Sequence, residues 1–295
     1  MTGPGMPLLD GDSLKQHSHA LIQAICLNDA QWQALPARPT APALFNGQAR
    51  QFPMVVDLQA LDDQQRKQLT DLSIAWLHDD NDSPFFSALL QAKVTTQHIA
   101  AHLARRFVIR RPDDGDDALR FFDPFVFRHL RWLLSPEQMD SLLGPITHWS
   151  WQEPSGVWQT HARTRAAPSL APLRLADKQW PSVMRIADIN LCLRRLTRSV
   201  LHIENTPTLA KRVDDLLTQA TDAHLRKRDD HHLYAEQAVR FHPRIHQHPQ
   251  LQARLAQARI GNVSYVYLCG DLSDERMHQF ASDIESQRIA HDHHP

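Results

Sequence analysis

One segment of this sequence reads HWSWQEPSGVWQTH, at residues 148–161. Its two outer runs are rich in Trp and other strand-forming residues, and the central Glu153-Pro154-Ser155-Gly156 is typical of a turn. The segment therefore predicts a β-hairpin. Trp149 and Trp151 are two positions apart and so lie on one face of the first strand, where indoles either fill the core or form a surface for another chain. Core filling is the more common outcome.

Other patterns predict the elements around this hairpin. A compact apolar run predicts a buried strand at 54–58, and a second hairpin is expected from 107–109 and 118–123. Helices are expected at 12–25, 62–77, 94–106, 124–134 and from Ser135, a good capping residue, to Gly144. The Pro-rich residues 35–53 indicate a loop with at most a short extended piece at 43–45. Residues 1–162 are thus expected to form an α/β (α+β) lobe with a small mixed sheet and flanking helices.

Beyond this lobe the pattern becomes helical. Residues 163–175 contain small residues and prolines and indicate a linker, after which 176–295 predict a mainly α-helical lobe. Apolar residues at three- and four-residue spacing predict an antiparallel pair of helices over 186–203 and 209–223. Shorter helices are expected at 233–240 and 250–259, a strand at 262–269 because of its Val and Tyr residues, and a final helix at 273–289.

Composition limits the classes of function. The chain of 295 residues has 42% hydrophobic residues, and 32 Lys and Arg against 33 Asp and Glu leave a net charge of -1. This balance gives no overall attraction to nucleic acid. The sequence contains no GxxxxGK[ST], GxGxxG or GxSxG motif. Three separated cysteines suit a reducing cytoplasm, and no apolar run is long enough to predict a membrane span.

The 19 histidines raise the possibility of a metal site. The densest group comprises His231, His232, His242, His246 and His248. His242 and His246 have the i,i+4 spacing that places two ligands on one helix face, but Pro243 and Pro249 interrupt a regular helix there. A metal-dependent hydrolase that uses this group is therefore the alternative function, and solvated or core-edge histidines are the more common explanation.

Two charged features each allow more than one interpretation. Asp123, near Arg120, is either an acid–base residue whose pKa is lowered by that arginine or the cap of the following helix. The basic group Arg194, Arg195 and Arg198 indicates either a solvated helix face or a contact surface, with RNA binding as a weaker alternative.

Residues 101–158 resemble a known family. The segments that carry the resemblance are HLARRFVIRRPDDG at 102–115, LRFFDPFVF at 119–127 and LGPITHW at 143–149, with FPMVVDL at 52–58 as an earlier strand. They are similar to the type VI secretion effector chaperone or adaptor family, whose corresponding signatures read HLRR before a hydrophobic run and DG, FRFYDPRVL, and GPI or GPV before a Trp. Leu119, Phe122 and Phe125 depart from that pattern, and Phe125 replaces an Arg, so any ion pair made by that Arg is lost here.

This resemblance implies a non-catalytic adaptor without a cofactor. Such a protein binds an effector in the cytoplasm and promotes its loading onto the VgrG spike protein. The charge balance and the lack of a long apolar run separately predict no nucleic-acid partner and no membrane span. The motif residues expected to maintain the fold are His102, Arg105, Arg106, Arg120, Phe121, Asp123, Pro124, Gly144 and Pro145. The residues expected to contact a partner are Trp149, Trp151, Trp158, Arg194 and Arg198.

Overall fold

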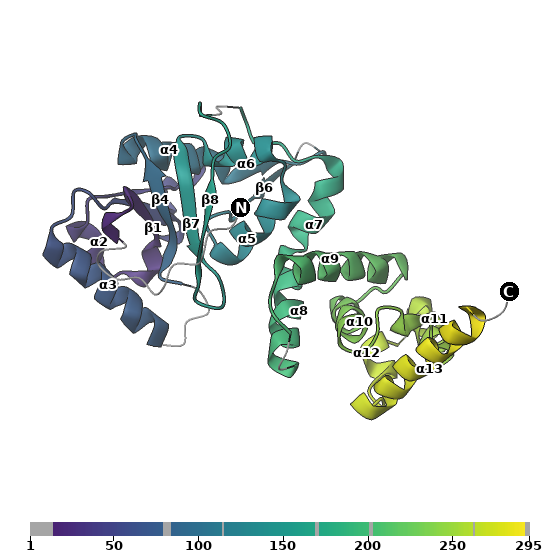
Figure 1. Cartoon of the computed structure of the whole chain (residues 1–295). Coiled ribbons are helices and arrows are strands. Elements are labelled where there is room, and N and C mark those ends of the chain that lie inside the picture. Colours follow the sequence, from purple (N-terminus) through teal and green to yellow (C-terminus); the bar gives the residue numbers. More distant parts are fainter. Residues whose placement is uncertain are drawn as a thin grey trace. The chain divides into compact units, whose positions relative to one another are not determined.

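The computed structural model describes residues 14–78, 84–113, 115–168, 171–200, 203–261 and 263–292. The chain divides into two compact units, Met1–Val183 and Met184–Pro295 (Figure 1). An α+β N-terminal part followed by a mainly helical part is confirmed. Residues 163–175, expected to be a linker, lie inside the first unit, and the boundary between the units falls just before Met184.

The first unit is built on a six-stranded sheet with the order β2-β3-β1-β4-β7-β8. The strands are β1 (His19–Gln23), β2 (Ala37–Pro39), β3 (Pro53–Asp57), β4 (Phe86–Ala92), β7 (Ile146–Gln152) and β8 (Trp158–Ala162). Every neighbouring pair is antiparallel, whereas a mixed sheet was expected. The reason is the position of β1. The helix α3 (Asp63–His78) connects β3 to β4, which run in the same direction, but β1 lies between them and is antiparallel to both.

The prediction of a helix at 12–25 was wrong, because β1 occupies its second half. Strand β4 was not predicted. Both are central strands whose residues are buried in succession, so their side chains do not alternate between polar and apolar. Such a run has no period of two in the sequence and is easily assigned to a helix or missed.

The predicted Trp-rich hairpin of residues 148–161 is confirmed as β7 and β8, which pair with Trp151 opposite Gln159. Strand β3 agrees with the expectation at 54–58, and α4 (Thr96–Arg106), α5 (Pro124–Leu133) and α6 (Pro136–Leu143) agree with the predicted helices. The hairpin expected from 107–109 and 118–123 forms a separate two-stranded sheet of β5 (Val108–Arg110) and β6 (Asp116–Ala118). Its second strand shares only Ala118 with the expected residues, so the prediction of a strand at 119–123 was wrong.

The Pro-rich segment is more ordered than predicted. It follows the short α2 (Asp29–Ala34) and contains strand β2 and the 3-10 stretch η2 (Ala43–Gln51). The stretch η2 includes residues 43–45, which were expected to be extended. Strand β2 pairs only with β3 and is an edge strand. Pro39 is tolerated there because a proline, which has no N–H to donate, is compatible with the outer edge of a sheet.

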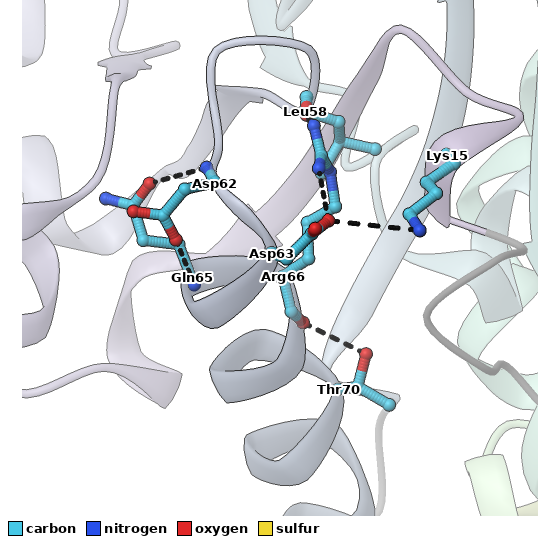
Figure 2. A network of polar contacts seen from close by, with 7 residues as sticks. All are labelled: Lys15, Leu58, Asp62, Asp63, Gln65, Arg66 and Thr70. Atoms are coloured by element: carbon cyan, nitrogen blue, oxygen red, sulfur yellow. Dashed lines mark hydrogen bonds and ion pairs between the residues drawn. The ribbon is translucent and has the colours of Figure 1, made fainter.

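Helix α3 is tied to the end of β3 by polar contacts (Figure 2). The carboxylate of Asp62 accepts a hydrogen bond from the backbone N–H of Gln65 at 2.7 Å, and the side chain of Gln65 accepts one from the N–H of Asp62 at 3.0 Å. Arg66 donates to the carbonyl oxygen of Leu58 from two guanidinium nitrogens and pairs with Asp63 at 3.1 Å. These bonds fix the direction in which the helix leaves the sheet.

Helices cover both faces of the sheet. On one face, Leu69 of α3 belongs to a core cluster with Ile22, Leu89 and Trp158. On the other face, the ring of Phe127 in α5 stacks on Trp149 with centroids 4.8 Å apart. The sheet therefore has no solvated face at its centre.

The second unit is mainly helical. The helix α7 (Trp180–Met184) ends at the boundary between the units, with only Met184 in the second unit. The helices that follow are α8 (Ile186–Ser199), α9 (Pro207–Asp222), α10 (Arg228–Arg240), α11 (Pro249–Ile260), α12 (Tyr265–Leu268) and α13 (Asp274–Asp292). The expected strand at 262–269 was wrong, because α12 forms there. Ser264 caps α12 by accepting from the N–H of Tyr267, and the buried Tyr265 donates its hydroxyl to Gln237 at 2.8 Å. These tertiary contacts override the strand propensity of Val and Tyr.

Candidate functional site

Two motif residues, His102 and Gly144, are in direct contact. Gly144 has a φ of 54°, and a Cβ at this position would lie 2.1 Å from Cε1 of the His102 ring. His102 donates from Nε2 to the carbonyl oxygen of Leu142 at 2.9 Å. Burial lowers the pKa of His102 to about 4, so the ring is neutral near pH 7. The pair holds α4 against the end of α6, and Pro145, also buried, leads directly into β7.

The LRFFDPFVF segment forms the start of α5. Asp123 is its N-cap and accepts from the N–H of Phe125 at 2.9 Å, with Pro124 at the first helical position. The capping interpretation is confirmed. Burial raises the pKa of Asp123 and outweighs the lowering effects of the Phe125 N–H and of Arg120, so this pKa is not lowered overall as the acid–base interpretation expected. The exposed Arg120 also lies over the ring of Phe122, at 5.5 Å.

Asp140 was missed by the sequence analysis and is a central polar contact of this segment. Its carboxylate accepts from the N–H and the hydroxyl of Thr164, at 2.8 and 2.6 Å, and from the N–H of Arg165 at 3.1 Å. Burial opposes its ionisation, but these hydrogen bonds outweigh it and hold the pKa of Asp140 below its ordinary value. Arg163 donates to the carbonyl oxygen of Gly144 at 2.5 Å. No local motif marks an aspartate whose partners lie more than twenty residues away in the sequence.

The three tryptophans proposed as partner contacts are in the core. Trp149, Trp151 and Trp158 are 1%, 0% and 3% exposed. Trp149 and Trp151 lie on the face covered by α5, and Trp158 lies on the face covered by α3. The interpretation as contact residues is corrected, because an indole with helices packed over it cannot reach a partner in this conformation. Their large apolar surface is used to hold the sheet between its two helical layers.

Glu153 in the hairpin turn holds two of the surrounding side chains. Its carboxylate accepts from Nε1 of Trp151 at 3.0 Å and pairs with Nε of Arg128 at 3.0 Å. Arg128 has a side chain only 4% exposed, and burial lowers its pKa. Arg131 lies over the ring of Trp151 at 4.7 Å. A charged carboxylate at the turn thereby compensates a buried guanidinium on α5.

The five histidines of the predicted metal group have separate partners. Within the described part of the chain, no three His, Cys, Asp or Glu side chains gather where they could hold a metal ion. His246 stacks on Tyr234 with centroids 3.5 Å apart, and His248 stacks on Phe280 at 3.9 Å. The polar partners are the carbonyl oxygen of Leu225 for His231, and the side chains of Asp188 for His232, Glu285 for His242, Gln237 for His246 and Asp283 for His248. The spacing of His242 and His246 does not bring them to one site because His246 lies in a separate 3-10 turn.

The cysteines are not activated as nucleophiles. Burial raises the pKa of Cys26 to about 11 and that of Cys192 to about 12, and it also raises that of Cys269. A thiol is reactive as its thiolate, so these thiols are suited to packing.

Two exposed features of the second unit could contact a partner. Arg194 and Arg198 are on the exposed face of α8, where the predicted contact residues remain accessible. The second feature is an apolar corner at the end of α11 and along α12. It consists of Ile260, Val263, Val266 and Tyr267, which are 73%, 38%, 41% and 78% exposed. The expected strand at 262–269 had hidden this corner, because Val263, Val266 and Tyr267 were assigned to it and Ile260 to no element.

Motif residues Arg105 and Arg106 end α4, and only Arg105 is exposed. Phe121 is buried and lies edge-on to Trp149, with centroids 6.1 Å apart.

No described helix combines the length and the apolar character that crossing a membrane requires. No protein-family model, curated protein or solved structure matches this chain.

We expect Gly144→Ala to lower the free energy of unfolding by about 3 kcal/mol, because the new methyl group collides with the His102 ring and φ is positive. The matched control is Gly156→Ala, where φ is 82° but the nearest atom would lie at 3.9 Å. It should cost about 1 kcal/mol. Urea denaturation measures both, and equal losses would show that the contact with His102 is unimportant.

We expect Glu153→Gln to cost about 3 kcal/mol of unfolding free energy, because the amide can still accept from Trp151 but no longer compensates the buried charge of Arg128. Glu137→Gln, at a side chain 63% exposed, is the control and should be nearly neutral. A loss below about 1 kcal/mol for Glu153→Gln in the same denaturation assay would contradict this role.

Stability should fall as the pH is lowered below 6.5. The folded pKa values of His102 and His246, about 4 and about 3, lie below the ordinary value of 6.5, so the unfolded chain takes up protons first. Each histidine should contribute a slope of about 1.4 kcal/mol per pH unit between pH 6 and 5. His246→Phe keeps a ring against Tyr234 and should reduce the slope by that amount. An unchanged slope in denaturation at several pH values would contradict the assignment.

Proposed function

We propose that this protein is a non-catalytic adaptor that binds a type VI secretion effector in the cytoplasm and promotes its loading onto the VgrG spike protein. The observation that carries the proposal is the structural role of the motif residues within 101–158, the segment that resembles the adaptor family. His102, Gly144, Asp123 and Pro124 are engaged in packing and capping, which is the role that the resemblance implies for them.

The chemistry of the described side chains also supports a binding role. The cysteine thiols have raised pKa values, and the five histidines between 231 and 248 are each bonded to a different partner. Asp123, the carboxylate considered for acid–base catalysis, is committed to capping α5. These groups stabilise the fold. Because the histidines and Asp123 are each bonded to a separate partner, they do not converge on one point as the side chains of a hydrolytic centre would.

The second unit offers the surface that an adaptor needs. The arginines Arg194 and Arg198 on α8 would give electrostatic attraction to an acidic partner, and the exposed apolar corner with Ile260 and Tyr267 would add apolar contact area. An adaptor must hold its cargo and then transfer it to the spike. Contacts that combine charge with a small apolar area suit reversible binding.

The test is a pull-down of the tagged full-length chain from its own cytoplasm, with mass spectrometry of the eluate. We expect the wild-type chain to recover a toxin-like polypeptide together with VgrG. The variant Arg194→Glu with Arg198→Glu should recover about ten-fold less of one of them, because repulsion replaces attraction at this surface.

The control variant is Lys67→Glu, which reverses an exposed charge on α3 of the first unit and should leave recovery unchanged. Recovery of neither polypeptide by a folded wild-type chain would refute the adaptor function. A folded chain that instead carries stoichiometric metal and neither partner would favour the hydrolase alternative.

A further inference from the structure

An arginine-rich cleft lies in the first unit, between the end of α4, strand β5 and residues 172–180. Its volume is about 580 Å³, and the lining includes apolar atoms of Val108, Leu173 and Leu175. The cationic and aromatic side chains that line it are Arg105, Arg106, Arg110, Arg111, Arg174 and Trp180. A cleft of this size accommodates a small ligand or a few residues of a peptide.

Arg106 is the unusual member of this set. It is 7% exposed, and its Nε atom is buried without a hydrogen-bond partner among the described residues. Burial, and then the neighbouring Arg105, lower the pKa of Arg106. The C-terminal end of α4 offsets part of the cost of this charge through its carbonyl dipoles. A buried guanidinium without a carboxylate is nevertheless unfavourable, so an anion entering the cleft would gain an interaction that the protein leaves open.

Trp180, which also lines the cleft, carries a second donor with no partner in the described part of the chain. It is 8% exposed, and its indole Nε1 is buried without a hydrogen-bond partner among the residues that the structure describes. A buried N–H group in this state costs free energy that an acceptor would recover. Because Arg106 and Trp180 both donate and neither can accept, the ligand must bring acceptor oxygens.

The remaining charges indicate what kind of anion fits. Arg105 and Arg174 are exposed at the cleft, and Arg111 is engaged by Asp113 at Nε, at 2.9 Å. Asp116 and Asp177 also line the cleft. These two carboxylates would repel a polymer with a charge at every unit, such as a nucleic acid, but leave room for a single carboxylate next to apolar groups.

We propose that this cleft binds an acidic segment of a partner polypeptide, with a carboxylate at Arg106 and Trp180 and a neighbouring apolar side chain against Leu173. The inference deepens the adaptor function and rests on it, since the polypeptide is a binding partner of the adaptor. It also gives Arg106, a motif residue expected only to maintain the fold, a direct part in recognition.

The test uses two pools of fluorescein-labelled peptides. The acidic pool has the form Gly-Ser-x-Glu-x-Asp-x-Ser-Gly, where x is Leu, Val or Phe, and the matched amide pool has Gln and Asn in place of Glu and Asp. Fluorescence anisotropy with the full-length chain measures binding. We expect the acidic pool to bind at least about ten-fold more tightly than the amide pool, and less tightly as salt is added. Equal binding, or no binding of either pool, would overturn the proposal.

Variants connect binding to the cleft. Arg106→Met and Arg174→Gln should each weaken binding of the acidic pool about ten-fold. Arg106→Met should unfold at an equal or higher temperature than the wild type, because it removes an uncompensated buried charge. Arg38→Gln, an exposed position on β2 outside the cleft lining, should change neither quantity. A destabilised Arg106→Met variant that binds the acidic pool normally would mean that Arg106 is only structural and would overturn the proposal.

Competition separates the possible ligand classes. Inorganic phosphate or a twenty-residue oligothymidine that displaces the acidic pool at a lower concentration than unlabelled acidic peptide would overturn the choice of a carboxylate. The experiments distinguish a wrong proposal for the cleft from a wrong proposal for the adaptor function. Peptide binding without recovery of effector or VgrG would refute only the adaptor function, and recovery of both without peptide binding would refute only the cleft.

Discussion

The contact between the His102 ring and the backbone of Gly144 is the constraint on which the resembling segment depends. It requires a neutral imidazole, a residue without a side chain and a positive φ at the same place. Because α4 and the end of α6 meet there, the start of β7 is placed beside β4, and the Trp-rich hairpin follows from that position. Asp140 and Arg163 then bind the chain that leaves β8 back to the same turn. The segment is thus closed by contacts between residues far apart in sequence.

Two buried arginines of the first unit, Arg128 and Arg106, differ in whether a carboxylate compensates their charge. Arg128 is compensated by Glu153, which also accepts from the indole of Trp151. Arg106 is buried to a similar extent but has no acceptor at Nε among the described residues. The first arrangement stabilises the fold, and the second costs stability. A group that is unfavourable in the free protein is a reasonable place for a ligand, because binding removes the cost.

The second unit uses its many histidines as individual hydrogen-bonding and stacking residues. His232 and His242 pair with carboxylates, while His246 and His248 lie flat on aromatic rings. A high histidine count therefore does not make a metal centre by itself. The basic face of α8 and the apolar corner at the end of α11 and along α12 are both exposed.

The sequence by itself determined the elements whose signals are local. The Pro-Ser-Gly turn marked the β7–β8 hairpin, Ser135 and Pro136 marked the start of α6, Asp123 marked the cap of α5, and three- and four-residue spacing marked α8 and α9. Only the tertiary structure decided the rest. Strands β1 and β4 are buried on both faces and carry no alternation, so their place at the centre of an antiparallel sheet depends on pairing with distant strands. The same holds for the roles of Trp149 and Arg106. Whether an indole is core or surface, and whether a guanidinium is paired or open, depends on which elements pack over it, and that information is not local to any stretch of sequence.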